Sequence, residues 1–334
     1  MMNTTSTSFQ TVLDALLSER KDFPRRYLQE FSDIGALELK TLLDVWPKVR
    51  PGRKLTLLEE LDALAEADTL VCFDDFARSL LTDPDPEVRT RAIRLLDEYE
   101  DPKIVPSYLD MLRNDPDINV RVEAANALNL FVDLGELEKI SDSVYHQIED
   151  ALLASAASED DVRVRRTALE SLGYSSRPEV STLIESAFHR QDPNWQASAL
   201  VAMGRSADER WDEHVTRSLV HVDDRIRKAA VVAAGELSLQ LARPILLKML
   251  GEEEEATILS AVIWSLSQIG GEDVRTYLEN ILDQLEDDDE EQIAFLEEAL
   301  DNLSFTEDLD RFDLLAIDPD DELLELEEDD EEEK

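Results

Sequence analysis

Apolar and small residues recur at a fixed spacing along the middle of the chain. Six segments share the pattern apolar-Arg-x-x-Ala-x-x-x-Leu, with substitutions, and they begin at Val88, Val120, Val164, Trp195, Ile226 and Ile258. The small residue four positions on and the larger apolar residue eight positions on lie on one face of a helix. The pattern therefore predicts an amphipathic helix in each segment, repeated every 31 or 32 residues with one longer spacing of 44.

A second helix is expected before each of these segments. Asp83, Asp115 and Asp192 each precede a proline, so these pairs are predicted to stop one helix and cap the next. A glycine near the end of three segments is expected to end the helix there: Gly173, Gly204 and Gly235. The repeated unit is then a helical hairpin, and neither of its helices buries an apolar face alone. Stacked hairpins share one continuous core, so the predicted fold is all-α, an α-solenoid.

Segments such as 83–96 and 258–270 resemble HEAT repeats, in particular the short form also found in phycobilisome-lyase-like proteins. The resemblance covers about residues 50–303 and implies a right-handed superhelix of HEAT-like hairpins. It implies little about function, because scaffolds, chaperones and a few enzymes share this repeat.

The repeat register divides the chain into four parts. Residues 1–8 are expected to be disordered, residues 9–50 to form capping helices, and residues 51–303 to form the solenoid, with six clear repeats and degenerate terminal ones. The 44-residue spacing indicates an insertion near 131–142, interpreted as a longer connection. Residues 304–334 form an acidic tail with 16 acidic and two basic residues. A disordered, solubilising tail is favoured, although its apolar islands leave open a segment that binds in cis or in trans.

Charge and composition limit the partners. The chain has 33 Lys+Arg against 78 Asp+Glu, a net charge of −45, which disfavours nucleic acid and anionic membranes. The uncharged stretch 256–271 is too short for a membrane span, and residues 1–8 lack the basic and apolar regions of a secretory signal. A single cysteine, Cys72, allows no internal disulfide. We therefore expect a cytoplasmic protein.

No pattern of catalytic or metal-binding residues is found. The four histidines (His146, His189, His214 and His221) lack ligand spacing, and the His-Glu pairs of HEAT-fold deoxyhypusine hydroxylases are missing. No glycine-rich phosphate loop occurs. Cys72 lies in an apolar run and is expected to be a buried, inert thiol. The sequence thus predicts no catalytic residue, metal or cofactor, and a protein that is not an enzyme.

Four arginines follow the first position of a repeat directly: Arg89, Arg121, Arg165 and Arg227. Such a row can hold phosphate, or it can form a ladder in which each guanidinium binds a carboxylate of a neighbouring connection, such as Asp83, Asp115 or Asp160. We favour the ladder, because carboxylates outnumber guanidiniums in these connections and the spacing follows the repeat.

The position six residues into each segment is expected to face the concave surface. It is occupied in turn by Arg94, Asn126, Glu170, Val201, Val232 and Trp264. Val201, Val232 and Trp264 make an apolar stripe, and such a stripe ending in an aromatic residue is typical of a partner-binding site. The alternative is that the next repeat or the tail covers Trp264.

These observations favour a non-enzymatic scaffold or adaptor that binds a protein or peptide partner on its concave face. The acidic surface favours a basic partner. Each repeat contacts only its neighbours, so a monomer is expected. The alternative is a phycobilin-lyase-like chaperone or lyase that acts on a chromophore protein, which the resemblance alone suggests.

Overall fold

The computed structural model describes residues 9–18, 21–286 and 289–314. The expected disordered segment 1–8 and residues 315–334 of the expected tail lie outside the described residues. Within the described ranges every regular element is a helix, as predicted. None of these helices combines the length and the apolar character that crossing a bilayer requires. The chain divides into two compact units, Met1–Ile184 and Glu185–Lys334.

Among its described residues, the first unit holds thirteen helical elements before the boundary helix. They are α1 (Phe9–Leu16), η1 (Arg25–Phe31), α2 (Ala36–Val45), η2 (Trp46–Lys48), α3 (Pro51–Ala67), α4 (Asp74–Leu80), α5 (Pro86–Arg94), η3 (Pro102–Ile104), α6 (Val105–Asn114), α7 (Ile118–Glu136), α8 (Asp142–Ala156), α9 (Val162–Ser171) and η4 (Leu172–Tyr174). Helix α10 (Pro178–Phe188) contains the boundary between the units.

The second unit continues the same alternation of helices. Its elements are α11 (Pro193–Arg205), η5 (Glu209–Trp211), α12 (Asp212–Ser218), α13 (Asp224–Glu236), η6 (Gln240–Ala242), α14 (Arg243–Glu252), α15 (Ala256–Ile269), α16 (Glu272–Leu282) and α17 (Glu290–Leu314).

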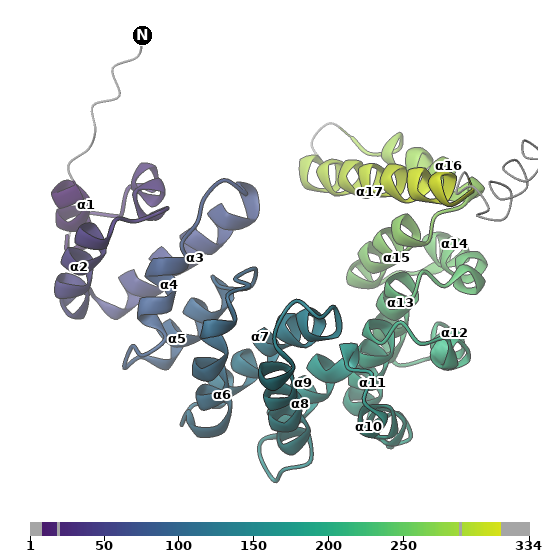
Figure 1. Cartoon of the computed structure of the whole chain (residues 1–334). Helices are drawn as coiled ribbons and strands as arrows, with labels where there is room; N and C mark the ends of the chain where they lie inside the picture. Colours follow the sequence, from purple (N-terminus) through teal and green to yellow (C-terminus); the bar gives the residue numbers. More distant parts are fainter. Residues whose placement is uncertain (1–8, 19–20, 287–288, 315–334) are drawn as a thin grey trace, which may run out of the picture. The chain divides into compact units, whose positions relative to one another are not determined.

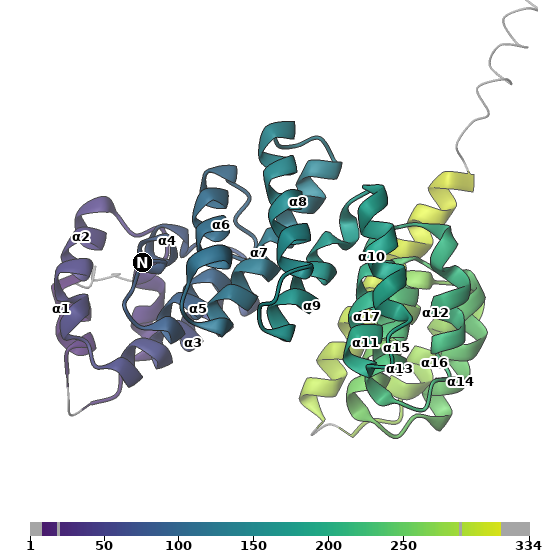
Figure 2. The same ribbon diagram turned by 90° about the horizontal axis from the view of Figure 1, so that it is seen from below.

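The repeated pattern lies on one helix of each hairpin, which we call the inner helix. In the first unit α3, α5, α7 and α9 pack on one another in sequence, and in the second unit α11, α13, α15 and α17 do the same (Figure 1 and Figure 2). The other helices, among them α4, α6 and α8 and then α12 and α14, pack against the inner helices as a second row. The chain is therefore an α-solenoid of helical hairpins, as the sequence predicts.

The core between the rows is made by the residues that the pattern singles out. The first positions Val88, Val120 and Val164 are 0% exposed. All six small residues four positions on are also 0% exposed: Ala92, Ala124, Ala168, Ala199, Ala230 and Val262. Small side chains at this place let consecutive inner helices approach closely while the flanking leucines fill the core.

Of the three glycines predicted to end helices, Gly173 follows the end of α9, but the other two have a different role. Gly204 lies inside α11 and Gly235 inside α13. A Cβ on Gly204 would come within 2.8 Å of the backbone of Ala233, and one on Gly235 within 2.9 Å of the backbone of Ser265. These two glycines therefore permit close helix packing and do not end their helices.

The residues near 131–142 also differ from the prediction. Helix α7 extends to Glu136 and α8 begins at Asp142, so most of the extra residues lengthen two helices. The cause is that the apolar pattern continues: Phe131, Val132 and Leu134 are all buried. The connection that remains is short.

The acidic segment begins later than predicted. Helix α17 runs to Leu314, so residues 304–314 belong to the last helix. Thr306 Oγ1 donates a hydrogen bond to the carbonyl of Ser267 (3.0 Å), and Arg275 Nη2 forms an ion pair with Glu307 (2.8 Å). These contacts hold residues 306 and 307 of α17 against α15 and α16. The net charge of the segment does not predict them.

The N-terminal elements form an aromatic cluster. The ring of Phe31 contacts those of Phe9, Phe23 and Phe76 at centroid distances of 6.5, 6.1 and 5.4 Å. Trp46 adds an edge-to-face contact with Phe76 at 5.4 Å. Since Phe76 lies on α4, the cluster joins α1 and η1 to the first hairpin.

Candidate interaction surfaces

Three arginines of the row form the predicted ladder, whereas Arg165 Nε donates to the carbonyl of Ala156 at 3.2 Å. Arg89 binds Asp115 through two parallel hydrogen bonds (Nε to Oδ2, 2.9 Å; Nη2 to Oδ1, 2.8 Å). Arg121 binds Asp160 in the same way at 2.9 and 2.7 Å, and Arg227 binds Glu253 at 2.8 and 3.2 Å. Each pair joins an inner helix to the connection before the next inner helix. The arginines are therefore engaged within the protein, in agreement with the ladder and against a phosphate site.

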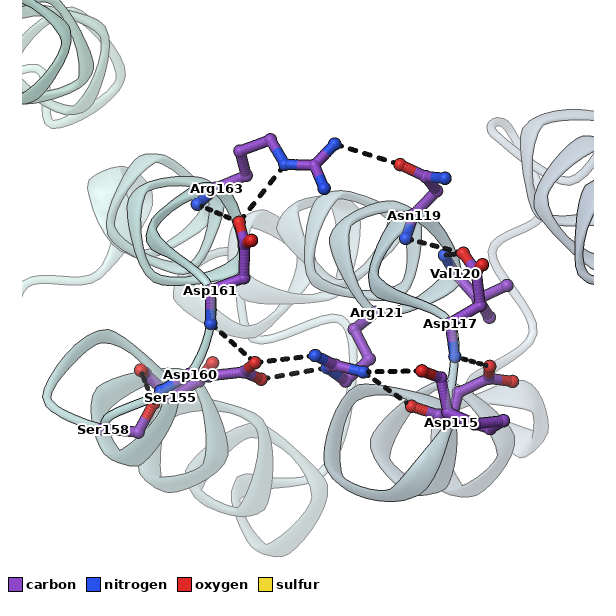
Figure 3. A network of polar contacts seen from close by, with 11 residues as sticks. Asp115, Asp117, Asn119, Val120, Arg121, Ser155, Ser158, Asp160, Asp161 and Arg163 are labelled. Carbon is purple, nitrogen blue, oxygen red and sulfur yellow. Dashed lines mark hydrogen bonds and ion pairs between the residues drawn. The ribbon is translucent and has the colours of Figure 1, made fainter.

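Each of these guanidiniums also bonds its own connection. Nη1 of Arg121 donates to the carbonyl of Asp115 at 2.8 Å, so the side chain lies between two connections (Figure 3). The hydrogen bonds from Arg121 hold the pKa of Asp160 below its usual range, although partial burial opposes the shift. Those from Arg227 lower the pKa of Glu253 in the same manner. Both carboxylates stay ionised at neutral pH and keep the pairs intact.

The two aspartates of an Asp-Pro-Asp connection have different roles, and the sequence analysis did not predict this difference. The first aspartate of an Asp-Pro-Asp run holds the neighbouring cation, and the second caps the helix. Asp85 accepts from the backbone N–H of Glu87, and Asp117 accepts from that of Asn119. The predicted caps Asp83 and Asp115 are thus wrong by two residues, whereas Asp192 does cap α11.

A further rung was not predicted because it uses lysine. Lys54 Nζ lies 3.1 Å from Asp83 Oδ2, and the Trp46 indole donates to the same oxygen at 2.7 Å. Both charged side chains are less than 10% exposed. Each ladder arginine stands three residues before a buried residue of the repeat pattern, and Lys54 stands three residues before the buried Leu57. The sequence register could therefore have revealed Lys54 as a rung of the ladder.

A second row of polar contacts runs beside the ladder. Arg163 Nη1 donates to Asn119 Oδ1 at 3.1 Å, and Arg225 Nη1 donates to Asn194 Oδ1 at the same distance. All four residues stand one position before the start of a repeat. In each unit, therefore, a hydrogen bond of this kind joins the N-terminal ends of two neighbouring inner helices.

The predicted binding residues lie on successive inner helices of the second unit. Val201 is on α11, Val232 on α13 and Trp264 on α15, and each is half-buried. Consecutive inner helices pack together here. We call Val201, Val232 and Trp264 the apolar stripe.

In the first unit, Arg94 occupies the repeat position that the apolar stripe has in the second unit, and its charge is paired within the protein. In the first unit Arg94 donates to Glu123 on α7 through both Nε, at 3.0 Å, and Nη2. Its neighbour Arg91 forms an ion pair with Glu59 on α3 at 2.5 Å. The hydrogen bonds with Glu123 hold the pKa of Arg94 above its usual value, although burial opposes the shift.

The cysteine and the histidines are placed as follows. Cys72 is half-buried, so the expectation of a buried thiol is wrong, and burial together with nearby carboxylates raises the pKa of this thiol. The ring of His214 packs edge-on against Phe188 and Trp211 at 5.3 and 5.6 Å. His221 Nδ1 accepts a hydrogen bond from the backbone N–H of Asp223 at 3.0 Å. His221 thus occupies the position that the first aspartate has in other connections. In the part of the chain that the structure describes, no three His, Cys, Asp or Glu side chains are grouped as metal ligands.

An acidic pocket in the first unit was not predicted. It has a volume of about 690 Å³ and lies along α3, the segment before α4, the end of α5 and α7. Six carboxylates and one guanidinium line it: Asp62, Glu66, Asp74, Asp97, Glu98, Glu123 and Arg94. We call this cavity the acidic pocket.

The comparison with protein families matches this architecture. Models of HEAT repeats match residues 75–144, 149–235 and 213–301, which is more than half of the chain. The chain belongs to the HEAT-repeat family. No curated protein matches this HEAT-repeat protein.

Three solved structures are similar to this chain. The complex of CpcE and CpcF of phycocyanin lyase from Nostoc sp. PCC7120 is 16% identical, with a TM-score of 0.50 over 90% of this chain and 97% of that one. YibA from E. coli is 14% identical, with a TM-score of 0.41 over 86% and 99% of the two chains. Kap121p bound to Ste12p is 14% identical, with a TM-score of 0.42 over 90% and 38%. At such identities the similarity concerns the fold alone.

Proposed function

We propose that this HEAT-repeat protein is a non-enzymatic scaffold that binds a protein or peptide partner through the apolar stripe. The observation that carries the proposal is the placement of Val201, Val232 and Trp264 on three stacked helices. The residues directly before and after each of them in the sequence are buried, while these three side chains keep part of their surface open. Partly exposed apolar groups in a row, with an indole among them, have the composition of an interface centre.

The chemistry of the chain supports a binding role over a catalytic one. The pKa of the Cys72 thiol is raised, so this thiol is a poor nucleophile at neutral pH. The ladder arginines are engaged by carboxylates of the same protein. With a net charge of −45, the surface favours a partner that carries positive charge. The alternative role, lyase-like action on a chromophore protein, rests on the similarity of fold.

Replacement of Trp264 tests this function. Affinity purification with the Trp264→Ala variant is expected to recover at least about tenfold less partner than the unchanged chain, because a buried aromatic anchor contributes more than about 1.4 kcal/mol. Tyr277→Ala is the matched control, since Tyr277 is a 47% exposed aromatic residue on α16 of the same unit. Equal recovery with both variants, each folded by circular dichroism, would refute the apolar stripe as the binding site.

A further inference from the structure

The sequence beyond Leu314 combines apolar residues with carboxylates. Leu323, Leu324 and Leu326 lie within four positions, and residues 318–325 hold five carboxylates and no cation. Apolar groups gain free energy when a surface shields them from water. The segment therefore suits a surface that offers apolar contact together with positive charge.

The surroundings of the apolar stripe differ in charge from the rest of the chain. One helical turn before and after each stripe residue, the positions on the same face hold two cations and one carboxylate, whereas carboxylates outnumber cations 78 to 33 in the whole chain. These positions are occupied by Ala197 and Arg205 on α11, Lys228 and Glu236 on α13, and Ser260 and Gln268 on α15. Lys228 is exposed and forms no ion pair within the described ranges. Apolar surface and positive charge thus lie together here.

The end of α17 lies close to the apolar stripe and belongs to the same compact unit. Thr306 donates to the carbonyl of Ser267 at 3.0 Å, and Ser267 follows Trp264 by three residues on α15. From Thr306 to Leu314 the helix adds about 12 Å, at about 1.5 Å per residue. The two helix spacings from α15 to α11 amount to about 16–20 Å. Residues 315–326 span up to about 40 Å when extended, so the whole stripe is within their reach.

Tethering favours this segment over a free ligand. A segment linked to its own site has a local concentration in the millimolar range. A contact with a Kd of about 0.1 mM is then about 90% formed within one chain. Even a weak interaction of three leucines is therefore sufficient to cover the apolar stripe.

We propose that residues 315–326 cover the apolar stripe of their own chain, with the three leucines packed on it and carboxylates beside Lys228. The inference rests on the proposed scaffold function and deepens it, because it assigns an internal competitor to the same binding site. A partner must displace this segment before it can bind. The chain thereby limits access to its own site.

Trp264 provides the readout of this contact, because it is half-buried and the other tryptophans are protected. The other three are at most 4% exposed: Trp46, Trp195 and Trp211. Quenching of tryptophan fluorescence by acrylamide, a neutral molecule, therefore reports mainly on Trp264. The measurement uses the full chain.

The variant that tests the contact is Leu323→Ser/Leu324→Ser/Leu326→Ser, which we call the leucine variant. It is expected to raise the quenching constant about twofold or more, because the indole is uncovered. The matched control makes the same three changes at leucines that are more than 70% exposed elsewhere in the chain: Leu37, Leu70 and Leu241. The control should leave quenching unchanged.

Two results would overturn the proposal. Equal quenching of the leucine variant and the unchanged chain, both folded by circular dichroism, would mean that the segment does not cover Trp264. A difference that appears only at high protein concentration would mean a contact between two copies instead of one within a single chain.

The charge at the site is tested with a fluorescein-labelled peptide of residues 315–328, added to the leucine variant so that the chain's own segment does not compete. Lys228→Gln is expected to weaken binding of the peptide about two- to threefold, as measured by anisotropy. Lys248→Gln is the matched control, since Lys248 is an exposed lysine of the same unit on α14. Equal weakening by both changes would mean attraction by overall charge and would overturn the assignment of this segment.

Partner recovery separates this inference from the proposed function. The leucine variant should recover about threefold more partner in affinity purification, because the competitor is lost. If quenching is equal while Trp264→Ala still loses the partner, the inference alone fails. If quenching rises while Trp264→Ala keeps the partner, the segment covers the apolar stripe but the proposed function fails.

Discussion

At the scale of single residues, the ladder arginines connect parts of the chain that are distant in sequence. Arg121 holds Asp160, 39 positions later, and the carbonyl of Asp115, six positions earlier. The guanidinium and the carboxylate are only 15% and 27% exposed. Because little water is available to replace these bonds, their loss leaves unsatisfied polar groups at the junction of two repeats.

We therefore expect Arg121→Ala to lower the free energy of unfolding by about 1–3 kcal/mol at pH 7. The folded-state pKa of Asp160 is lowered from 3.8. The pair thus contributes its stability above about pH 4, and the contribution is lost as the pH falls through the folded pKa. The difference between the two proteins should shrink below pH 3.8 in thermal melts at several pH values.

The control for this substitution is Arg113→Ala. Arg113 is exposed on α6, so its loss should change the melting temperature little at any pH. An Arg121→Ala protein as stable as the unchanged chain at pH 7 would contradict a structural role for the ladder.

At the scale of elements, the last helix shows how a boundary depends on contacts. Among the described residues beyond 303, three side-chain bonds reach another helix: Arg275 with Glu307 at 2.8 Å, Arg275 with Ser304 at 3.0 Å, and Thr306 with the carbonyl of Ser267 at 3.0 Å. They join α17 to α15 and α16. The sequence of this segment is dominated by acidic residues, so composition alone assigns it to a tail.

A chain ending at residue 303 should consequently be less stable than one ending at residue 314. Each lost hydrogen bond costs about 0.5–1.5 kcal/mol, which predicts a total of about 1.5–4.5 kcal/mol in denaturant unfolding. The substitution Phe305→Ser in the longer chain is the control, since this ring is 64% exposed. Equal stability of the two chain lengths would show that residues 304–314 add nothing to the fold.

At the scale of the whole molecule, the sequence allowed the fold to be predicted because one register repeats six times. Every small residue of the pattern, from Ala92 to Val262, is fully buried. The extension of α7 was not predicted, because a spacing gives the number of inserted residues and says nothing of their conformation. The role of Gly235 was missed as well. This glycine is needed because the backbone of Ser265 on α15 lies close to it, and the sequence around Gly235 does not show that contact.

The candidate sites were less accessible to sequence analysis. The apolar stripe was named from helical periodicity, and the structure places its residues on stacked helices. The acidic pocket brings Asp62 together with Glu123, which are far apart along the chain and belong to no common motif. In a protein with 78 acidic residues, no single carboxylate is distinguished before the fold is known.

The overall charge leads to a prediction whose sign can be decided by counting. Even if every Lys and Arg pairs with one carboxylate, at least 45 carboxylates have no cation of their own. Salt weakens the exposed ion pairs, each worth about 0–1 kcal/mol, but it also screens repulsion among this larger number of like charges. Repulsion should prevail, so added NaCl is expected to stabilise the protein by about 1 kcal/mol or more, a rise of roughly 2–4 °C in Tm.

Melting curves between low and moderate NaCl, with sucrose as an uncharged control, measure the effect. A Tm that falls with salt would mean that the ion pairs outweigh the repulsion of the acidic surface.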